Sequence, residues 1–314
     1  MKFTKMQGIG NDYVYVNGFE ESVEDPSEAA RLVSDRHFGI GSDGLILICP
    51  SETADAKMVM YNSDGTLGSM CGNGVRCVAK YVYDYGIARK QTLHIETGSG
   101  IRELFLTFDE EGLVDQVRVN MGQPELRPDR IPVVPALLSG RRRLERQAVV
   151  ESFPDSEEAG LEKNSPVISR TLEVRGSFYQ ATCVSMGNPH CVIPVEDPSA
   201  LNLEKIGPYF EHLEAFPDRV NTEFIKVRNS REVEMRVWER GAGETLACGT
   251  GACAVAVACI LNGWTERKVT VALRGGNLEI EWNEEDGNVY MTGPARKVFD
   301  GIVSLKELAC GKGA

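Results

Sequence analysis

Two cysteines stand in nearly identical surroundings in this sequence. Cys71 lies in the segment Met70-Cys71-Gly72-Asn73-Gly74, and Cys248 lies in Ala247-Cys248-Gly249-Thr250-Gly251. Each segment directly precedes an apolar run of helical length, so we expect each thiol at a helix N-terminus. Unpaired N–H groups and the helix dipole favour an anion there and make a thiol easier to ionise. Two such thiols suit removal of a proton from one face of a carbon and its return on the other, which is racemisation or epimerisation.

The glycines beside these cysteines suit the same chemistry. A carbanion next to a carboxylate must be stabilised if no cofactor does it. We expect the N–H groups of Gly72-Asn73 and of Gly249-Thr250 to point at that carboxylate, each well-placed donor contributing about 3–4 kcal/mol. Glycine allows the close approach of backbone to substrate that this requires.

The chain repeats itself around the two cysteines. A Gly-Asn pair lies upstream of each, and both Asn11 to Cys71 and Asn188 to Cys248 span 60 residues. The same offset of 177 relates further pairs, namely Gly10 and Gly187, Gly72 and Gly249, Gly74 and Gly251, Tyr61 and Trp238, Gly98 and Gly275. This shared spacing predicts duplicated domains, with a pseudo-twofold axis that brings both helix N-termini to one cleft.

The pattern of apolar residues predicts many strands and few helices. The run 252–261 has no polar face, so we expect a sheet to surround that helix. This gives an α+β fold of two pseudo-symmetric halves, each a strand-rich sheet wrapped around a central apolar helix, rather than a doubly wound parallel sheet. The expected helices are 26–36, 72–85, 201–212 and 252–261. The expected strands are 3–17 around a glycine loop, 45–49, 57–61, 92–96, 102–108, 114–120, 178–185, 191–195, 222–228, 232–238, 269–273, 277–282 and 289–292.

Composition excludes several function classes. The 314 residues, 42% of them hydrophobic, suffice for two ordinary cores. A net charge of −12 argues against nucleic-acid and anionic-membrane partners. The N-terminus lacks a signal-peptide core and the longest apolar run, 252–261, is too short to cross a bilayer, so we expect a cytoplasmic protein.

The nine cysteines form no CxxC pair. Their odd number and spacing favour free thiols in a reducing compartment. No Cys/His cluster has zinc spacing among only four histidines, so we expect no metal. The remaining thiols are expected to be small buried hydrophobes: Cys49, Cys77, Cys183, Cys191, Cys253, Cys259 and Cys310.

Seven segments, in order along nearly the whole chain, resemble diaminopimelate epimerase. They are Gly10-Asn11-Asp12, Tyr61-Asn62-Ser63-Asp64-Gly65, Met70-Cys71-Gly72-Asn73-Gly74, Gly187-Asn188-Pro189-His190, Val220-Asn221-Thr222-Glu223, Trp238-Glu239-Arg240-Gly241-Ala242-Gly243-Glu244-Thr245 and Ala247-Cys248-Gly249-Thr250-Gly251. The resemblance implies interconversion of LL- and meso-2,6-diaminopimelate in lysine and peptidoglycan synthesis, without pyridoxal phosphate, another cofactor or a metal. It also implies a homodimer of chains that each contain two similar α/β barrels.

The resemblance also implies roles for individual residues. The acid/base pair falls on Cys71 and Cys248, and the residues that tune the thiols fall on His190 and Glu239. The substrate-binding positions fall on Asn11, Asn62, Gly72, Asn73, Asn188, Asn221, Glu239, Arg240, Gly249 and Thr250. The implied halves are 1–124, carrying Cys71, and 125–293, carrying Cys248, with 294–314 returning to the first.

The sequence departs from the family at three places. Gly44 stands where some members use a glutamine for substrate, so that contact is lost or made by backbone alone. Phe299 stands at a dimer-contact tyrosine and lacks its hydroxyl. The segment 137–165 is longer than usual. It lies in the stretch 123–165, whose composition is typical of a linker with a solvated insertion: Pro124, Pro128, Pro132, Pro135, the run Arg141-Arg142-Arg143 and the acidic stretch 155–158.

Plainer interpretations compete with several of these roles. The four asparagines could be turn residues, Arg240 and Glu239 a surface ion pair, and His190 a structural histidine. The alternative functions are a racemase of another amino acid, thiol–disulfide or cysteine-hydrolase chemistry, and a binding protein that kept the fold. The absence of CxxC and of a clear Cys/His/Asn triad argues against the thiol chemistries, and two intact cysteines argue against a binding protein.

Overall fold

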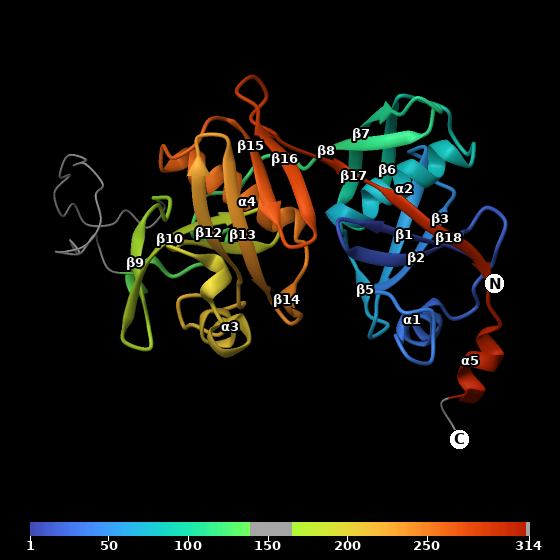
Figure 1. Cartoon of the computed structure of the whole chain (residues 1–314), viewed down its shortest axis with the longest axis horizontal. Helices are drawn as coiled ribbons and strands as arrows, with labels where there is room; N and C mark the ends of the chain where they lie inside the picture. Colours follow the sequence, from blue (N-terminus) through green and yellow to red (C-terminus); the bar gives the residue numbers. More distant parts are fainter. Residues whose placement is uncertain (139–164, 312–314) are drawn as a thin grey trace. The chain divides into compact units, whose positions relative to one another are not determined.

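The computed structural model describes residues 1–138 and 165–311. They form two compact units, each described by itself (Figure 1). Unit 1 is Met1–Met121 with Gly275–Glu279 and Tyr290–Ala314, and unit 2 is Gly122–Arg274 with Ile280–Val289. These units differ from the expected halves at 122–124, which pack with unit 2, and at 275–279 and 290–293, which pack with unit 1. The expected division into domains stays a prediction, and the segment 139–164, most of the expected insertion, lies outside the described residues.

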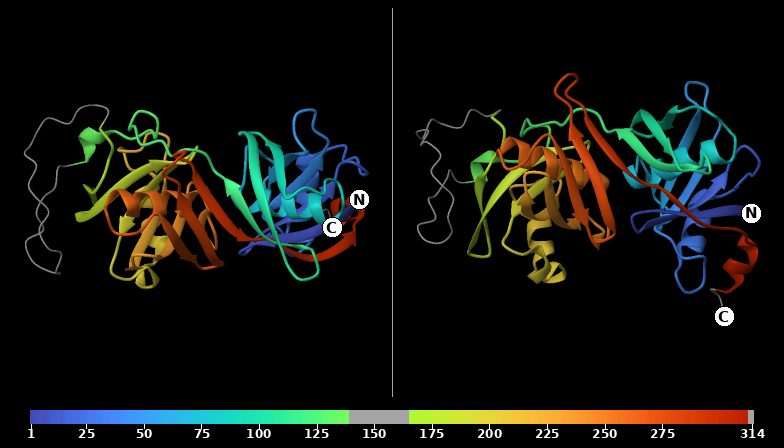
Figure 2. Two further views of the ribbon diagram at one scale, coloured as in Figure 1. Left: turned by 90° about the horizontal axis from the view of Figure 1, so that it is seen from above. Right: turned by 45° about the horizontal axis from the view of Figure 1, so that its top comes forward.

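In unit 1 the strands surround helix α2 (Gly72–Asp84), as Figures 1 and 2 show. The strands lie in the order β18-β1-β2-β3-β4-β6-β7-β8-β17, with β2/β3 and β4/β6 parallel, the other pairs antiparallel, and β5 on β4. Because β17 runs into β18 after one residue, the two ends of this order are one stretch of chain, and the sheet closes around the helix. Their bounds are β1 Lys2–Gly8, β2 Asn11–Asn17, β3 Gly44–Cys49, β4 Ala56–Asn62, β5 Leu67–Gly68, β6 Thr92–Thr97, β7 Gly100–Phe108, β8 Val114–Asn120, β17 Val289–Pro294 and β18 Arg296–Ile302.

Unit 2 repeats this plan around helix α4 (Gly249–Leu261). Its strands lie in the order β9-β10-β11-β12-β13-β15, with β11/β12 and β13/β15 parallel, the other pairs antiparallel, and β14 on β13. Their bounds are β9 Arg170–Val174, β10 Ser177–Ser185, β11 Pro189–Pro194, β12 Asn221–Asn229, β13 Glu232–Glu239, β14 Gly243–Thr245 and β15 Lys268–Leu273; β16, Gly276–Trp282, follows.

The offset of 177 holds element by element. It carries the first and last residues of α2, Gly72 and Asp84, onto those of α4, Gly249 and Leu261. It carries the pairing sequence β1-β2-β3-β4-β6 onto β10-β11-β12-β13-β15 with the same parallel and antiparallel pairs. The register of the parallel pair is kept too, since Val14 faces Leu45 and His190 faces Asn221, each 31 residues on. The predicted duplication and strand-rich fold are confirmed.

The two central helices are buried by different means. In α4 every residue from Gly251 to Cys259 is buried and apolar, as its sequence predicts. In α2 two cations are buried as well. Arg76 donates to the carbonyl groups of Gly72 and Pro294, and Lys80 donates to Val114 O and pairs with Asp84 at 2.7 Å. These bonds satisfy charges that would otherwise oppose burial.

Three shorter helices lie outside the sheets. Helix α1 (Pro26–Ser34) begins at Asp25, whose carboxylate accepts from Glu28 N at 2.9 Å. It packs its apolar face on β2 and β3, and α5 (Leu305–Gly311) packs against α1. Helix α3 (Leu203–Glu211) buries Phe210 in unit 2, edge-on to Phe224 with ring centroids 5.1 Å apart. Two 3₁₀ turns, Pro135–Leu137 and Pro198–Ala200, complete the described elements.

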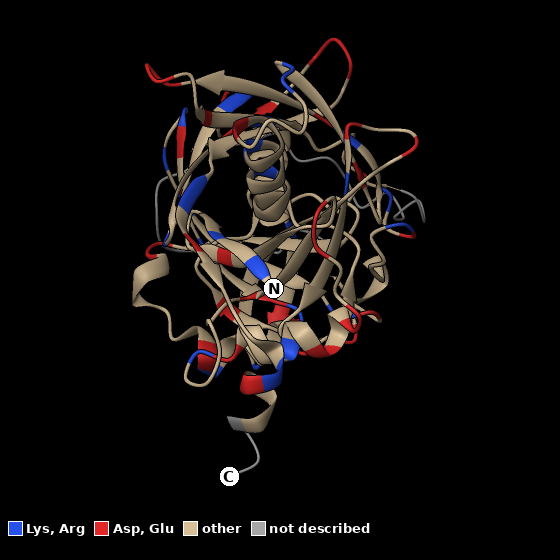
Figure 3. Cartoon of the chain, turned by 90° about the vertical axis from the view of Figure 1, so that its right-hand side faces the viewer, with Lys and Arg blue, Asp and Glu red and all other residues tan. Residues whose placement is uncertain are grey.

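Figure 3 shows acidic residues on several turns and loops, where water solvates their negative charge. All nine cysteines are free thiols. The expectation that seven are buried is wrong for Cys310, which is exposed on the short terminal helix, and for Cys49, which is half-buried at the end of β3. None of the helices within 1–138 and 165–311 is long and apolar enough to span a bilayer.

Candidate functional site

In unit 1 the predicted residues gather where α2 begins. Cys71 is the N-cap, with extended backbone angles of φ −131° and ψ 118°, and its Sγ accepts from Gly74 N at 3.3 Å. The Cys71 thiol donates to Asn11 Oδ1 at 3.2 Å. Asn11 is held in turn by Asp43, whose carboxylate accepts from Asn11 Nδ2 at 2.7 Å and from Asp12 N at 3.0 Å. The amide of Asn11 is therefore oriented toward the sulfur.

Tyr13 and Gly44, which lie beside each other in unit 1, limit the charged and polar groups near Cys71. Burial, then the nearby Cys71 and Asp43, raises the pKa of the Tyr13 phenol well above its ordinary value, so Tyr13 stays neutral. A Cβ on Gly44 would lie 2.1 Å from Tyr61 O and 2.8 Å from the Tyr13 ring. No side chain fits there, so this position offers substrate only its backbone. Asn62 bonds locally, donating to Thr66 Oγ1 at 2.9 Å in the β4–β5 turn.

In unit 2 Cys248 caps α4 in the same way, with φ −126° and ψ 110°. Its Sγ lies 3.6 Å from Thr250 Oγ1, which accepts from Asn188 Nδ2 at 3.3 Å. Asn188 Oδ1 faces His190 Nε2 at 3.0 Å. A line of hydrogen-bonding groups thus joins the cysteine to the histidine.

Three ionisable groups surround Cys248: His190, Glu239 and Glu223. His190 is fully buried, and its Nδ1 lies 2.6 Å from Glu223 Oε1. Glu239 accepts from Thr245 Oγ1 at 2.5 Å and from the Cys248 thiol. Burial raises the pKa of Glu239 despite these bonds.

The same surroundings hold the proton on Cys248. Burial first, then the carboxylates of Glu239 and Glu223, raises the pKa of its thiol well above the ordinary value. The bonds from Thr250 and from the Gly251 backbone act in the opposite direction and are smaller. The expectation of easier ionisation is therefore wrong for Cys248 in the substrate-free protein, because desolvation and like charge outweigh the helix N-terminus.

Arg240 is exposed and carries a guanidinium group at the end of β13. Asn221, buried on β12, positions it by donating to Pro189 O at 2.8 Å and accepting from Arg240 N at 2.9 Å. Glu211 holds the next residue, accepting from Gly241 N at 3.0 Å. The amide of Asn221 is thus bonded to backbone at both ends. Arg240 Nη1 donates to Asp218 O at 2.8 Å, and the plain ion pair with Glu239 is not formed.

The structure adds Glu223, Tyr13 and Asp43 to the predicted residues. For Glu223 the sequence held a signal, because an acidic residue in the middle of the buried strand Thr222-Glu223-Phe224-Ile225 requires a partner. Tyr13 and Asp43 carried none, since a phenol and a loop carboxylate are ordinary in strands and turns.

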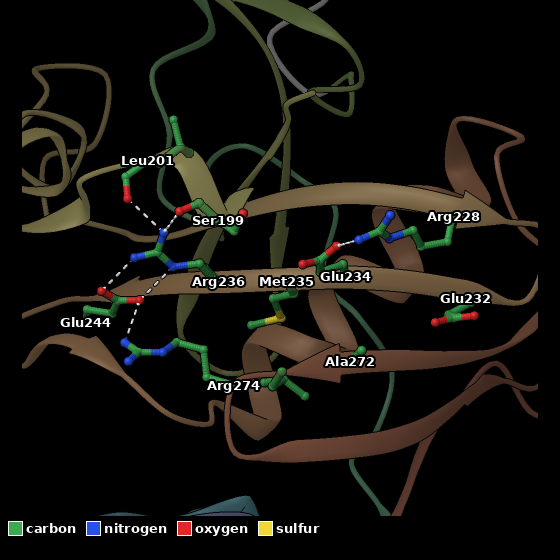
Figure 4. Close-up of a pocket in the computed structure, with 11 residues that line it drawn as sticks. Ser199, Leu201, Arg228, Glu232, Glu234, Met235, Arg236, Glu244, Ala272 and Arg274 are labelled. Carbon is green, nitrogen blue, oxygen red and sulfur yellow. Dashed lines mark hydrogen bonds and ion pairs between the residues drawn. The ribbon is translucent and has the colours of Figure 1, made fainter. Parts of the chain in front are cut away.

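A separate hollow of about 670 Å³ lies in unit 2 (Figure 4). Its charged side chains pair with one another. Arg236 donates two hydrogen bonds to the Glu244 carboxylate, from Nε at 2.8 Å and from Nη2 at 2.9 Å, and Arg274 Nη1 lies 3.0 Å from Glu244 Oε1. None of the predicted site residues lines it. These ion pairs join β13 and β14 to Arg274, the residue that follows β15, and they neutralise much of the charge in the lining. Among the described residues no group of three or more metal-ligating side chains converges.

The comparisons with known proteins agree with this geometry. The family model described as "Diaminopimelate epimerase" matches residues 3–127 and 182–298. A diaminopimelate epimerase of Acetivibrio thermocellus is 54% identical over 308 residues, covering 98% of this chain and 100% of its own length. The chain belongs to the diaminopimelate epimerase family. The predicted resemblance is confirmed, and with it the prediction that the protein is an isomerase of the epimerase class.

Further members of the diaminopimelate epimerase family are similar over the whole length. The one from Desulfovibrio desulfuricans is 54% identical over 96% of this chain and 97% of its own, and the one from Methanococcus maripaludis is 50% identical over 97% and 100%. Among solved structures, a probable proline racemase from Agrobacterium radiobacter aligns over 97% of this chain and 93% of its own with a TM-score of 0.66 at 12% identity. A PhzF-family protein of Bacillus anthracis aligns over 96% and 99%, with a TM-score of 0.63 at 16% identity. These two likenesses show the fold.

Proposed function

We propose that this protein interconverts LL- and meso-2,6-diaminopimelate in lysine and peptidoglycan precursor synthesis, with Cys71 and Cys248 as a two-base pair. The observation that supports it best is the repeated cap, in which a cysteine begins each central helix in duplicated surroundings. One thiolate removes the α-proton and the other cysteine, as a thiol, returns a proton to the opposite face. No cofactor enters the reaction.

The proton on Cys248 suits this residue to the role of the acid. Its thiol keeps its proton in the substrate-free protein because burial and two carboxylates oppose the thiolate. When Cys71 is the thiolate that removes the α-proton, Cys248 therefore has a proton to return to the opposite face. After each turnover the cysteine that acted as base holds a proton and the one that acted as acid has lost its own. Both must return to their starting states before the next turnover in the same direction.

The binding residues divide by the charge that they meet. The helix N-termini at Gly72-Asn73 and Gly249-Thr250 stabilise the reacting carboxylate as negative charge develops. Arg240 binds the distal carboxylate, since guanidinium is its natural bidentate partner. Asn11, Asn62, Asn188 and the Glu239 carboxylate orient the substrate and offer oxygen acceptors to its amino groups. Asn221, whose amide is bonded to backbone at both ends, acts by positioning Arg240.

The test is exchange of the α-hydrogen of diaminopimelate with D₂O, followed by NMR together with the change of stereochemistry. Cys71→Ala and Cys248→Ala should each lower epimerisation by at least about 10²-fold, the usual contribution of one positioned acid or base. Cys259→Ala, at the far end of α4, is the matched control and should keep the wild-type rate. A wild-type rate in either Cys71→Ala or Cys248→Ala would refute the proposal.

The proposal includes a homodimer in the cytoplasm. Strand β18 pairs with β1 along one edge, and it exposes the apolar side chains Val298, Phe299 and Ile302. Exposed apolar groups on such a strand are typical of an interface. The ring of Phe299 packs edge-on against Phe3 with centroids 5.8 Å apart, so the missing hydroxyl leaves its packing intact. Nine free thiols fit a reducing compartment.

A further inference from the structure

Glu223 is a buried carboxylate to which the proposed reaction assigns no role. It lies on β12 and is 0% exposed. One oxygen, Oε1, is 2.6 Å from His190 Nδ1, while Oε2 has no hydrogen-bond partner among the described residues. A carboxylate placed so deeply needs a positive partner to remain charged. His190 is the cationic side chain in contact with it.

The contacts of His190 define its charge. Nδ1 faces the Glu223 carboxylate, and Nε2 faces Asn188 Oδ1 at 3.0 Å. With Glu223 ionised, both partners are hydrogen-bond acceptors, so each ring nitrogen carries a hydrogen and the ring is the imidazolium cation. The orientation of the Asn188 amide is consistent with a hydrogen on His190 Nε2. Its Nδ2 donates to Thr250 Oγ1 at 3.3 Å, which leaves Oδ1 to accept from the ring. Thr250 accepts that bond, which leaves its own hydrogen for Cys248 Sγ, 3.6 Å away.

Gly251 makes room for this arrangement at the start of α4. A Cβ on Gly251 would lie 2.8 Å from Glu223 Oε1, 3.2 Å from Cys248 Sγ and 3.1 Å from Met235 Cε. The carboxylate and the sulfur thus both touch the first turn of the same helix. The positive end of the helix dipole favours the negative charge of Glu223 there.

Unit 1 shows that this charge is not a general requirement of the fold. Under the offset of 177, His190 corresponds to Tyr13, and Glu223 corresponds to Ile46. Ile46 approaches the equivalent glycine, since a Cβ on Gly74 would lie 2.9 Å from its Cδ1. The fold therefore accepts an apolar side chain at this place. The ion pair of His190 and Glu223 is specific to the unit that carries Cys248.

We propose that Glu223 is a positioning residue for the reaction at Cys248: it holds His190 as an imidazolium, which fixes the Asn188 amide and directs the Thr250 hydroxyl at the sulfur. This inference rests on the proposed epimerase function. The ionisable groups that face the pair are Glu239 on β13, Cys248 at the start of α4 and Cys191 on β11. When Glu223 is neutral, His190 can take a single hydrogen and accept a bond from a flipped Asn188, which breaks the line to Cys248.

The test uses the full-length protein with Glu223→Gln, which keeps shape and removes charge. Side-chain ¹⁵N NMR of the four histidines reads the charge of His190 directly, assigned with His190→Gln. We expect the wild-type His190 ring to carry a hydrogen on both nitrogens, and Glu223→Gln to leave it with one. In the same variant kcat for diaminopimelate should fall about 10- to 100-fold, with KM changed much less.

Two further variants separate positioning from folding. Glu223→Asp keeps the charge and should restore the imidazolium signal with part of kcat. Asp84→Asn removes another carboxylate, which is 12% exposed, pairs with Lys80 and lies at the opposite end of α2 from Cys71, and it should change neither His190 nor kcat. A neutral His190 in the wild type, a His190 signal unchanged by Glu223→Gln, or an unchanged kcat would overturn the inference. The NMR result stands whether or not diaminopimelate is the substrate, so failure of the proposed function is seen separately.

Discussion

At the level of single residues, the two cysteines have matching backbones and different neighbours. Cys71 meets Asn11 and the neutral phenol of Tyr13, whereas Cys248 meets Glu239 and the pair of His190 and Glu223. The helix N-terminus is common to both, so it cannot make them differ. Burial and the carboxylates on two adjacent strands hold the proton on Cys248.

Gly251→Ala tests how closely the residues at Cys248 are packed. The added methyl group would press on Glu223 Oε1 and Cys248 Sγ, so we expect kcat to fall at least about 10-fold. The control is Gly263→Ala at the other end of α4. Gly263 has a φ of 72°, so an alanine there should lower the free energy of unfolding by about 1–2 kcal/mol. The space around the added methyl group is open, so we expect kcat to be unchanged. Steady-state kinetics and urea unfolding measure both, and equal kcat values for the two variants would contradict the prediction.

At the level of elements, each half places one helix inside its own sheet. The cysteine is the cap, and the strands that supply its neighbours end beside the first turn. Because the helices occupy equivalent places, equivalent substitutions should have similar energetic costs. The order of strands, and not the composition of the helix, determines which side chains reach the sulfur.

Ala79→Leu and Ala256→Leu test this equivalence. The two alanines are related by the offset of 177, and both are fully buried. A larger side chain at either place overpacks the space between helix and sheet, which should cost about 1–3 kcal/mol. Urea unfolding monitored by circular dichroism gives the two values. A large loss for one variant and none for the other would show that the two helices are packed differently.

The buried thiols of the central helices predict a loss of stability at high pH. Burial raises the pKa of Cys77 to about 11 and that of Cys259 to about 12. Unfolded thiols ionise near pH 9, so the unfolded state releases protons first, and stability present below pH 9 declines as pH rises toward 11 or 12. Each thiol contributes up to about 1.4 kcal/mol per pH unit. Cys259→Ala should make the decline of unfolding free energy above pH 9 shallower; an identical slope would contradict this.

At the level of the whole molecule, the proposed reaction requires both sulfurs to reach opposite faces of one carbon. Mild oxidation should therefore join Cys71 to Cys248 and abolish epimerisation, with recovery on reduction. The experiment uses a Cys310→Ser background, because exposed Cys310 would otherwise link two chains. Peptide mass spectrometry identifies the bond. Full activity in protein that carries this disulfide would rule out the two-base pair.

Assembly is tested on β18. Ile302→Glu places a charge on a side chain that is 79% exposed, and in the proposed dimer this charge would be buried without a partner. Sedimentation should then show a monomer. Leu67→Glu, on a side chain that is 68% exposed on β5, is the control and should leave the dimer intact. Equal sedimentation of both variants would place the interface elsewhere.

The sequence by itself determined the duplication, the two capped helices and the family. These depend on spacing, local capping and periodicity, which are properties of the linear sequence. The offset of 177 and the fully apolar run of α4 can be found without knowing the tertiary structure. It missed β5, β9, β14, β18 and α5, which are short or are defined by distant strands. Only the tertiary structure decided the charge around Cys248. His190, Glu223 and Glu239 come from three strands, and the pKa of a thiol depends on which groups burial brings within a few ångströms of it.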